Sequence, residues 1–322
     1  KHAMLDHVVG DHFVEDTDAL FFRLQCDQQP NILNSYRKWT ERVDDDVVGL
    51  VLRLKKMLGK IESAMTDNEG KVNYKQAKNH ALYPAFEEAV CELQGVVIAN
   101  MKENVKLAFC INLYNLMIKY AFMKVGIGTT GSSRLNFFNN VSMQVGFDVL
   151  SFQDLENGVL RDNRKAPYAL QKQFHADDDR LRLTVDHVDN RIHFALNCGA
   201  ASCPPVKAFH AESIEEELRI IAQAFCEDDS NVRIDPETSE VHLSSIFNWY
   251  KEDFCGPSGK SSDLLPIILP FLRDFKKQNL EVMINSGKKV KVIFNKYNWT
   301  SDASSFVPFS GGNLRANSTR FL

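Results

Sequence analysis

The spacing of apolar residues changes from a helical to a strand-like period part-way along the chain. Between residues 35 and 64, apolar side chains recur every three or four positions and charged residues fill the gaps, which predicts one long amphipathic helix. A loop is expected at 66–70 and a further helix over 84–99. The apolar positions of the long helix are Val43, Val47, Leu50, Val51, Leu54, Met57, Leu58 and Ile61.

Residues 105–122 are apolar almost all round, which predicts a buried helix. Its polar exceptions, Asn112, Asn115 and Lys119, fall on one stripe of that helix. Because buried amides need hydrogen-bond partners, the stripe either ties down a neighbouring loop or lines a cleft.

Short strands are expected later in the chain, over 141–145, 147–150, 181–185, 191–197, 232–235, 240–243 and 290–295. Helical segments are expected at 154–160, 214–225, 245–254 and 264–275. Ser213 and Glu216 have the spacing of a capping box at the start of the second of these. Helices come first and strands cluster later, which predicts an α+β fold with N-terminal helices packed on a mainly antiparallel sheet.

Composition and charge narrow the class of protein. The chain has 322 residues, of which 44% are hydrophobic and 25% charged, as in ordinary globular proteins. Its net charge of -4 and its single basic cluster (Lys288, Lys289 and Lys291) argue against nucleic acid as a partner. No apolar run approaches the roughly 20 residues of a transmembrane helix.

The seven cysteines are spread along a chain too long to need disulfide staples. Residues 1–10 lack the apolar core of a secretory signal. We therefore expect reduced thiols and a cytoplasmic protein.

Gly126, Gly128 and Gly131 match a dinucleotide-binding pattern by letter, but a helix is expected before them rather than a strand. They are better explained as the end of the buried helix. We therefore expect no cofactor, and no residue is assigned as a metal ligand.

The most suggestive chemistry lies in residues 191–205. Ile192, Phe194 and Leu196 alternate with polar or small residues, which predicts a strand with one apolar face and with His193 on the other. Cys198 is the next position on the apolar side of this alternation, so it is expected to be buried. Cys203 follows a loop of small residues that can bend its thiol back towards His193.

Three interpretations of this segment remain open from the residues alone. The first is a structural loop with unreactive thiols. The second is a nucleophilic pair formed by Cys203 and His193. The third is a zinc site formed by Cys198, Cys203 and His193, for which a second ligand pair at typical spacing is missing.

Glu156 and Arg161 form the other suggestive pair, five residues apart. They fit either a structural ion pair or a site that orients a substrate carboxylate.

Five segments, in this order, resemble the domain of unknown function 547 family: 107–115, 155–161, 193–205, 247–254 and 297–299. The resemblance covers most of a domain that we place at 71–302, and the family's activity is unassigned. Members commonly have tryptophan where this chain has Cys110, which implies that Cys110 is not a nucleophile. The order of a buried helix followed by a sheet that carries His193 is also similar to papain-like and transglutaminase-like folds.

The opening residues are similar to the end of a DEP domain, through His12, Phe13, Asp16 and residues 20–24. The expected layout is a partial DEP-like segment at 1–34, a long linking helix at 35–70, the family domain at 71–302 and a loose tail at 303–322.

The function that we favour from the sequence is a thiol-dependent hydrolase or acyl-transferase acting on a peptide-like or amide substrate. Cys203 is the expected nucleophile, His193 the base, and Glu156 or Asn197 the group that orients the imidazole. Asn112, Asn115, Arg161 and Asn197 are the expected substrate contacts. The alternative is a non-catalytic signalling module that binds a protein partner through the DEP-like segment and the long helix.

Overall fold

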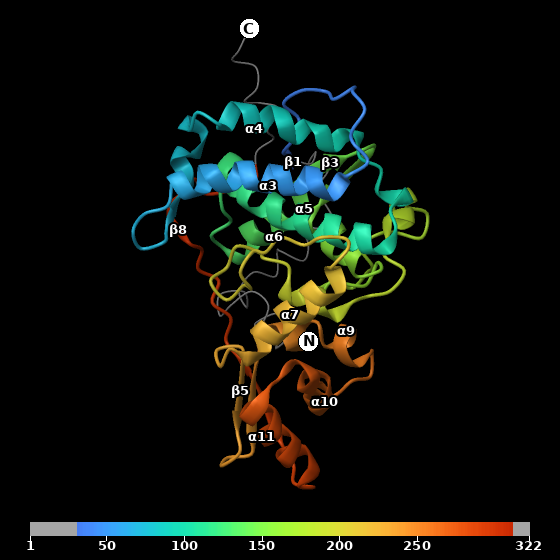
Figure 1. The fold of residues 1–322 in the computed structure, drawn as a ribbon, viewed down its shortest axis with the longest axis vertical. Helices are drawn as coiled ribbons and strands as arrows, with labels where there is room; N and C mark the ends of the chain where they lie inside the picture. Colours follow the sequence, from blue (N-terminus) through green and yellow to red (C-terminus); the bar gives the residue numbers. More distant parts are fainter. Residues whose placement is uncertain (1–30, 312–322) are drawn as a thin grey trace.

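The structure is a computed structural model that describes residues 31–311. It confirms the α+β class (Figure 1). In place of one mainly antiparallel sheet, the described residues form three small sheets with the strand orders β1-β3-β4, β2-β8 and β5-β6-β7. Helices supply most of the framework between them.

The upper part of the molecule is helical, with α3 (Val47–Ala64) next to α4 (Tyr83–Ala89) and α5 (Glu103–Lys124) (Figure 1). Helix α5 buries 17 of its 22 residues, which confirms the expected buried helix. Its length and all-round burial make it the central helix of this upper part.

Helix α3 begins twelve residues later than expected. Asp46 caps it by accepting a hydrogen bond from the backbone N–H of Gly49 at 2.8 Å. The preceding segment is held in a loop by Gln94, whose amide donates to the carbonyls of Asn34 (2.7 Å) and Arg37 (2.9 Å). These tertiary contacts are not visible in the apolar spacing.

The second expected helix also ends early. Helix α4 passes into a 3₁₀ turn, η2 (Val90–Gly95), and η3 (Ile98–Asn100) follows. The 3₁₀ helix η1 (Tyr74–Asn79) precedes α4.

Gly126 ends α5 as expected, with a positive φ of 99° and its N–H bonded to the carbonyl of Ala121 at 3.1 Å. A further helix, α6 (Gly131–Asn140), follows, although no clear helix was expected there. Thr130 caps it through a capping box with Ser133.

The first sheet joins β1 (Asn31–Ile32), β3 (Val141–Val145) and β4 (Asp148–Ser151). Strand β3 is parallel to β1 and antiparallel to β4. The two strands expected at 141–150 are thus confirmed.

The second sheet pairs β2 (Val72–Asn73) with β8 (Ala303–Ser305). Phe309 packs edge-on against Phe137, with ring centroids 5.3 Å apart. Residues 303–309 therefore belong to the fold rather than to a loose tail.

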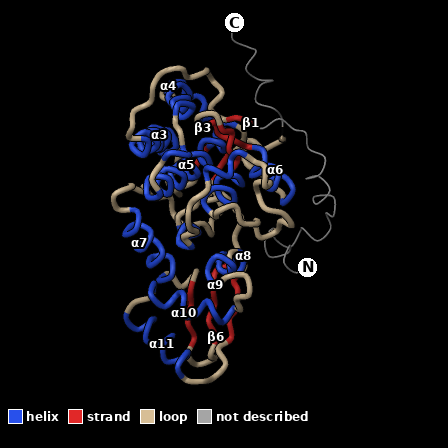
Figure 2. The backbone as a smooth tube through the Cα atoms, turned by 90° about the vertical axis from the view of Figure 1, so that its right-hand side faces the viewer, coloured by secondary structure: helices blue, strands red, loops and turns tan. Residues whose placement is uncertain are grey.

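The third sheet lies in the lower part of the molecule, beside α10 and α11 (Figure 2). Strand β6 (Glu240–Ser244) is antiparallel to β5 (Val232–Asp235), which confirms the expected hairpin, and parallel to β7 (Lys291–Asn295). The helices around it are α7 (Ile214–Glu227), α8 (Ser245–Trp249), α9 (Lys251–Cys255), η7 (Ser261–Asp263), α10 (Leu264–Ile268), η8 (Leu269–Phe271) and α11 (Asp274–Asn285).

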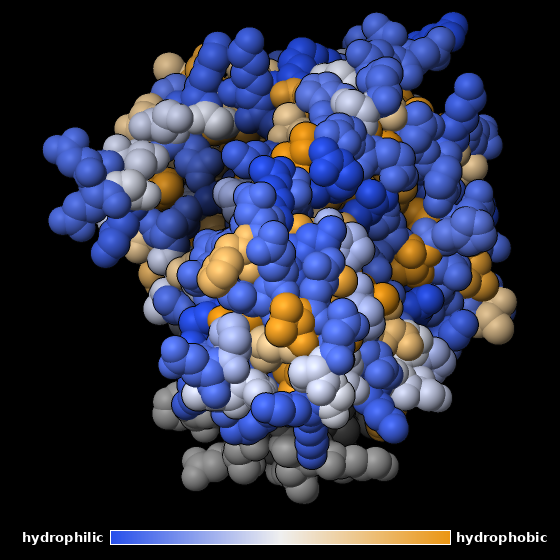
Figure 3. Space-filling view, turned by 60° about the horizontal axis from the view of Figure 1, so that its bottom comes forward, coloured by the Kyte–Doolittle hydropathy of each residue, from blue (hydrophilic) through white to orange (hydrophobic). Residues whose placement is uncertain are grey.

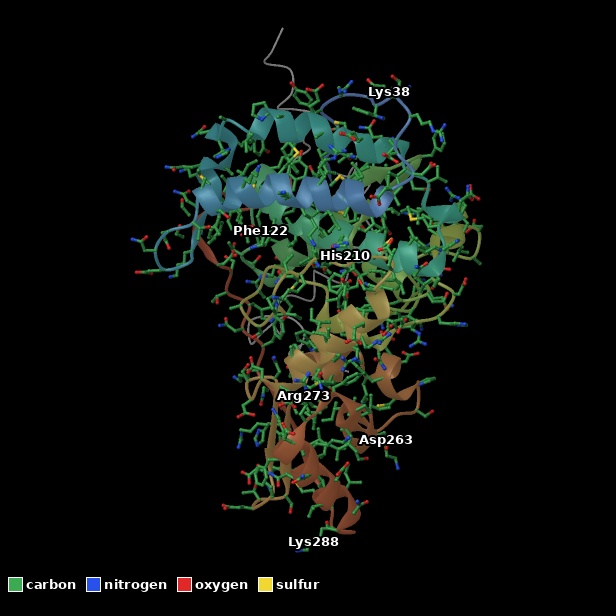
Figure 4. The ribbon with its side chains drawn as sticks, viewed as in Figure 1. Lys38, Phe122, His210, Asp263, Arg273 and Lys288 are labelled. Carbon is green, nitrogen blue, oxygen red and sulfur yellow. The ribbon has the colours of Figure 1, made fainter. Side chains whose placement is uncertain are left out.

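The expected capping box of α7 is not formed, because Ser213 donates to Glu217 at 3.0 Å. On the lower face, hydrophobic side chains are interspersed with hydrophilic ones (Figure 3). Lys38 and Lys288 mark the two ends of the long axis (Figure 4).

Candidate functional site

A cavity of about 690 Å³ brings together side chains from distant parts of the chain. Tyr114 comes from α5, Glu156 from a π-helical turn, His193 from a 3₁₀ helix, and Cys203 from the loop that follows. Concave sites with a few convergent polar groups are the usual place for small-molecule chemistry. Other lining residues include Arg134, Phe138, Cys198, Trp249, Tyr250, Tyr297 and Trp299.

His193 lies in η6 (Asn190–Phe194), a 3₁₀ helix where a strand was expected. Asp189 starts this helix by accepting a hydrogen bond from the N–H of Arg191 at 2.9 Å. Ile192, His193 and Phe194 are all buried, so the two-residue alternation in the sequence did not reflect two faces of a strand. The strand expected at 181–185 is likewise replaced by a 3₁₀ helix, η5 (Asp179–Leu183).

The imidazole of His193 is fixed by Asp253 and Tyr250. Its Nε2 lies 2.8 Å from Oδ2 of Asp253, and its ring stacks on that of Tyr250 with the centroids 3.8 Å apart. Burial lowers the pKa of His193, although the hydrogen bond to Asp253 opposes that shift. The carboxylate therefore selects the tautomer with the proton on Nε2 and leaves the basic lone pair on Nδ1.

Asp253 is held in turn by two arginines. Arg161 reaches its two oxygens at 2.5 and 3.0 Å, and Arg164 contacts one of them at 2.8 Å. Burial favours the neutral acid, but hydrogen bonds from His193 and Arg161 outweigh it, and the pKa of Asp253 lies well below its ordinary value. Arg161 is thus the partner of Asp253, not of Glu156 as the sequence suggested.

Glu156 lies in the π-helical segment η4 (Asp154–Leu160) and lines the cavity. The hydroxyl of Tyr114 donates to one of its oxygens at 3.2 Å, and that of Tyr250 donates to the other. Its carboxylate is therefore oriented by tyrosines, and the imidazole of His193 is oriented by Asp253 instead.

Cys203 is surrounded by groups that favour its thiolate. Its Sγ accepts a hydrogen bond from the N–H of Cys198 at 3.1 Å and lies 3.1 Å from the hydroxyl of Tyr297. Burial opposes ionisation, but hydrogen bonds from Cys198 and Tyr297 outweigh it, so the pKa of Cys203 lies below that of an ordinary thiol. Cys198, expected to be buried, is half-buried and lies on the same cavity wall.

Cys203 and His193 line the same cavity, but among the described residues no hydrogen bond joins them directly. In residues 31–311, no group of three potential ligands is placed to hold a metal ion. The zinc interpretation of Cys198, Cys203 and His193 therefore gains no support.

The three asparagines expected to contact substrate, Asn112, Asn115 and Asn197, do not line the cavity. Asn112 bonds to both backbone groups of Phe209, at 2.6 and 3.2 Å. Asn115 donates to the carbonyl of Ala195 at 2.9 Å and accepts from the N–H of Asn197 at 2.9 Å. This placement matches the first of the two roles considered for the stripe, which is to tie down a neighbouring loop.

Asn197 continues this arrangement along the loop. Its amide donates to the carbonyl of Pro204 at 2.7 Å and accepts from the N–H of Gly199 at 2.8 Å. Lys119, the third member of the stripe, pairs with Glu62 and Asp302 instead. The stripe thus fixes the segment that carries Cys203.

Lys55 gives a pH-dependent test of this anchoring. Its Nζ donates to Asn112 Oδ1 at 2.7 Å and to the carbonyl of Lys207 at 2.6 Å, and burial lowers its pKa to about 8. The folded state therefore binds fewer protons than the unfolded state between pH 8 and about 10.4, and this group makes stability rise across that window. We expect the Lys55→Met variant to lose this rise in the free energy of unfolding, measured by urea titration from pH 7 to 10.

The matched control is Lys56→Met, because Lys56 is the exposed neighbour on the same helix. An unchanged pH profile in Lys55→Met, relative to this control, would contradict the assignment of the rise to Lys55.

The fold and site define an α+β protein with a thiol- and imidazole-lined cavity. Residues 98–226 match the family model described as "Protein of unknown function, DUF547". The matched segment contains Glu156, His193 and Cys203, whereas Asp253 and Tyr297 lie beyond it. No curated protein and no solved structure matches the chain.

A papain-like or transglutaminase-like fold stays a prediction. The DEP-like segment lies outside the described residues except for 31–34, and the comparisons give it no support. Within residues 31–311, no helix combines the length and apolar character needed to cross a membrane.

Asp253, Tyr250, Tyr297 and Tyr114 are site residues that the sequence did not single out. The first three lie in segments 247–254 and 297–299, which carry the family resemblance, and Tyr114 lies in segment 107–115. The only available signal was therefore their position in those motifs.

Proposed function

We propose that the cavity is the site of a thiol-dependent hydrolase or acyl-transferase acting on an amide or peptide-like substrate. The observation that carries this proposal is that Cys203, His193 and Glu156 all line one cavity. Cys203 is the nucleophile, His193 is the base, and Asp253 is the positioning residue that holds the imidazole.

In the proposed reaction, the sulfur of Cys203 attacks the substrate carbonyl carbon while its proton passes to His193. The imidazolium then protonates the leaving amine, and a thioester remains on Cys203. Water, or an amine in the transferase case, attacks the thioester and gives a proton to His193. That proton returns to the departing sulfur, so both groups end as they began.

Glu156 is well suited to bind the nitrogen side of the substrate. Its carboxylate faces the cavity and is held by two tyrosine hydroxyls, which leaves acceptor capacity for an amide N–H or an ammonium group. Asn112, Asn115 and Asn197 act on this reaction by positioning the Cys203 loop. Arg161 acts by holding Asp253.

The Cys203→Ser variant tests the proposal. Because a serine hydroxyl is far less acidic than a cysteine thiol and is a weaker nucleophile, we expect at least about a thousandfold loss of hydrolysis across a panel of aminomethylcoumarin amides and nitrophenyl esters. We also expect iodoacetamide at neutral pH to alkylate Cys203 before the other thiols, as measured by peptide mass spectrometry.

Cys255→Ser is the matched control, because Cys255 is also half-buried but does not line the cavity, and burial raises its pKa. If iodoacetamide alkylated Cys203 and Cys255 equally, and Cys203→Ser lost no hydrolysis, Cys203 would be excluded as the nucleophile. A non-catalytic interaction module would need no cleft that joins His193, Glu156 and Asn112. The first two share the cavity, and Asn112 does not line it.

A further inference from the structure

Two thiols meet at the cavity wall more closely than an enzyme with a single nucleophilic cysteine requires. The sulfur atoms of Cys198 and Cys203 lie 2.8 Å apart. The hydroxyl of Tyr297 lies 3.1 Å from the sulfur of Cys203 and 3.8 Å from that of Cys198. A disulfide has its sulfur atoms about 2.05 Å apart, so joining the two would need less than about 1 Å of movement.

The loop between the two cysteines is held in a defined shape. Gly199 has a positive φ of 84°, and a Cβ atom there would come within 2.3 Å of the ring of Phe122 (labelled in Figure 4), so this position requires glycine. The N–H of Ala201 donates to the carbonyl of Thr300 at 2.7 Å. The closeness of the sulfur atoms is therefore maintained by the surrounding fold.

The two thiols also differ in acidity. The hydrogen bond with Cys203, together with burial, raises the pKa of Cys198, whereas the pKa of Cys203 is lowered. One thiol is thus prepared to attack, while the other stays protonated until the first has reacted.

We propose that Cys203 and Cys198 form a redox-active dithiol that exchanges with low-molecular-weight disulfides entering the cavity. The thiolate of Cys203 attacks one sulfur of the incoming disulfide, forms a mixed disulfide with it and releases the other half as a thiolate. Cys198 then loses its proton to solvent and attacks the sulfur of Cys203. The second half leaves as a thiolate, and a Cys198–Cys203 disulfide remains.

In this exchange the incoming disulfide is reduced to two thiols, and the protein dithiol is oxidised by the same two electrons. The reaction needs no acyl substrate, so it stands apart from the proposed hydrolase or acyl-transferase. Where both hold, the oxidised form has no thiol available for acyl transfer.

The test incubates the full chain with mixtures of reduced and oxidised glutathione, followed by acid quenching, alkylation and peptide mass spectrometry. We expect the wild-type protein to form an internal disulfide between Cys198 and Cys203 as the oxidised fraction rises. The Cys198→Ser variant should instead accumulate glutathione on Cys203, because the mixed disulfide cannot be resolved. Cys203→Ser should lose both products.

Cys255→Ser serves as the control and should behave like the wild type. The proposal is overturned if the wild-type protein carries only glutathione adducts and no internal disulfide. It is also overturned if Cys203 in Cys198→Ser is modified no more than Cys255. Neither of these outcomes depends on amide hydrolysis. A failure of the disulfide-exchange proposal can therefore be distinguished from a failure of the proposed hydrolase or acyl-transferase function.

Discussion

Replacing Asp253 with alanine is expected to lower the free energy of unfolding by about 3–5 kcal/mol, the usual cost of removing one partner of a buried ion pair. The Asp253 carboxylate is fully buried and receives hydrogen bonds from Arg161 and His193. Its loss leaves the guanidinium of Arg161, which is only 2% exposed, without its counter-charge. Urea titration followed by circular dichroism measures the effect.

The matched control for this substitution is Glu216→Ala. Glu216 pairs with Arg219 on the surface, with more than half of its side chain exposed, so we expect no measurable change in the free energy of unfolding. Similar losses in the two variants would contradict the role given to Asp253.

The Asp253→Asn variant allows a second test, the pH dependence of stability, which can be measured even if the alanine variant does not fold. The pKa of Asp253 is lowered in the folded state, so its contribution is present above the unfolded value of about 3.9 and is lost as the pH falls further. We therefore expect the asparagine variant to show a shallower loss of stability below pH 4 than the wild-type protein. An unchanged acid profile would count against the assignment.

Phe137→Ala is expected to destabilise the protein by about 3–5 kcal/mol, because it opens a cavity in an aromatic cluster. Phe137 is 1% exposed and stacks on Phe152 with the centroids 5.4 Å apart. It also contacts Phe122 at 5.9 Å and Phe309 at 5.3 Å. Its ring therefore links α6 to α5 and to the C-terminal segment, and truncation removes both contacts.

Phe147→Ala is the control, since Phe147 is 96% exposed and the same truncation there leaves no cavity. We expect a change within about 0.5 kcal/mol by urea titration. If Phe137→Ala were equally mild, residues around Phe137 would have to collapse into the space, which a crystal structure of the variant would reveal.

The sequence predicted correctly those elements that depend on neighbouring residues alone, or that are apolar on every side. The buried helix α5 follows from its all-round apolar composition, and the β5–β6 hairpin follows from two short runs around a turn. Two predictions were wrong for a different reason: the helix expected over 35–46 and the strand expected over 191–197. Gln94 and Asp189 fix the backbone there through side-chain hydrogen bonds, which override the apolar period.

The residues of the candidate site also fall into two groups, those that the sequence could predict and those that it could not. Cys203, His193 and Glu156 carry chemistry that is visible in their residue types, and the structure brings them to one cavity. Asp253 could not be assigned from the sequence, because its hydrogen bond to His193 joins positions 60 residues apart. Nothing in the local sequence distinguishes it from Glu252, the preceding acid.

The C-terminal strap, residues 297–305, gives the thiol loop a mechanical link to the helical half. At one end Tyr297 contacts the sulfur of Cys203, and Thr300 binds the N–H of Ala201. At the other end, Oδ2 of Asp302 forms an ion pair with Nζ of Lys119 on α5 at 2.6 Å, and β8 pairs with β2. The same short segment therefore binds both the loop that carries Cys203 and the helix that carries Lys119, so it joins the thiol loop to the helical part of the molecule.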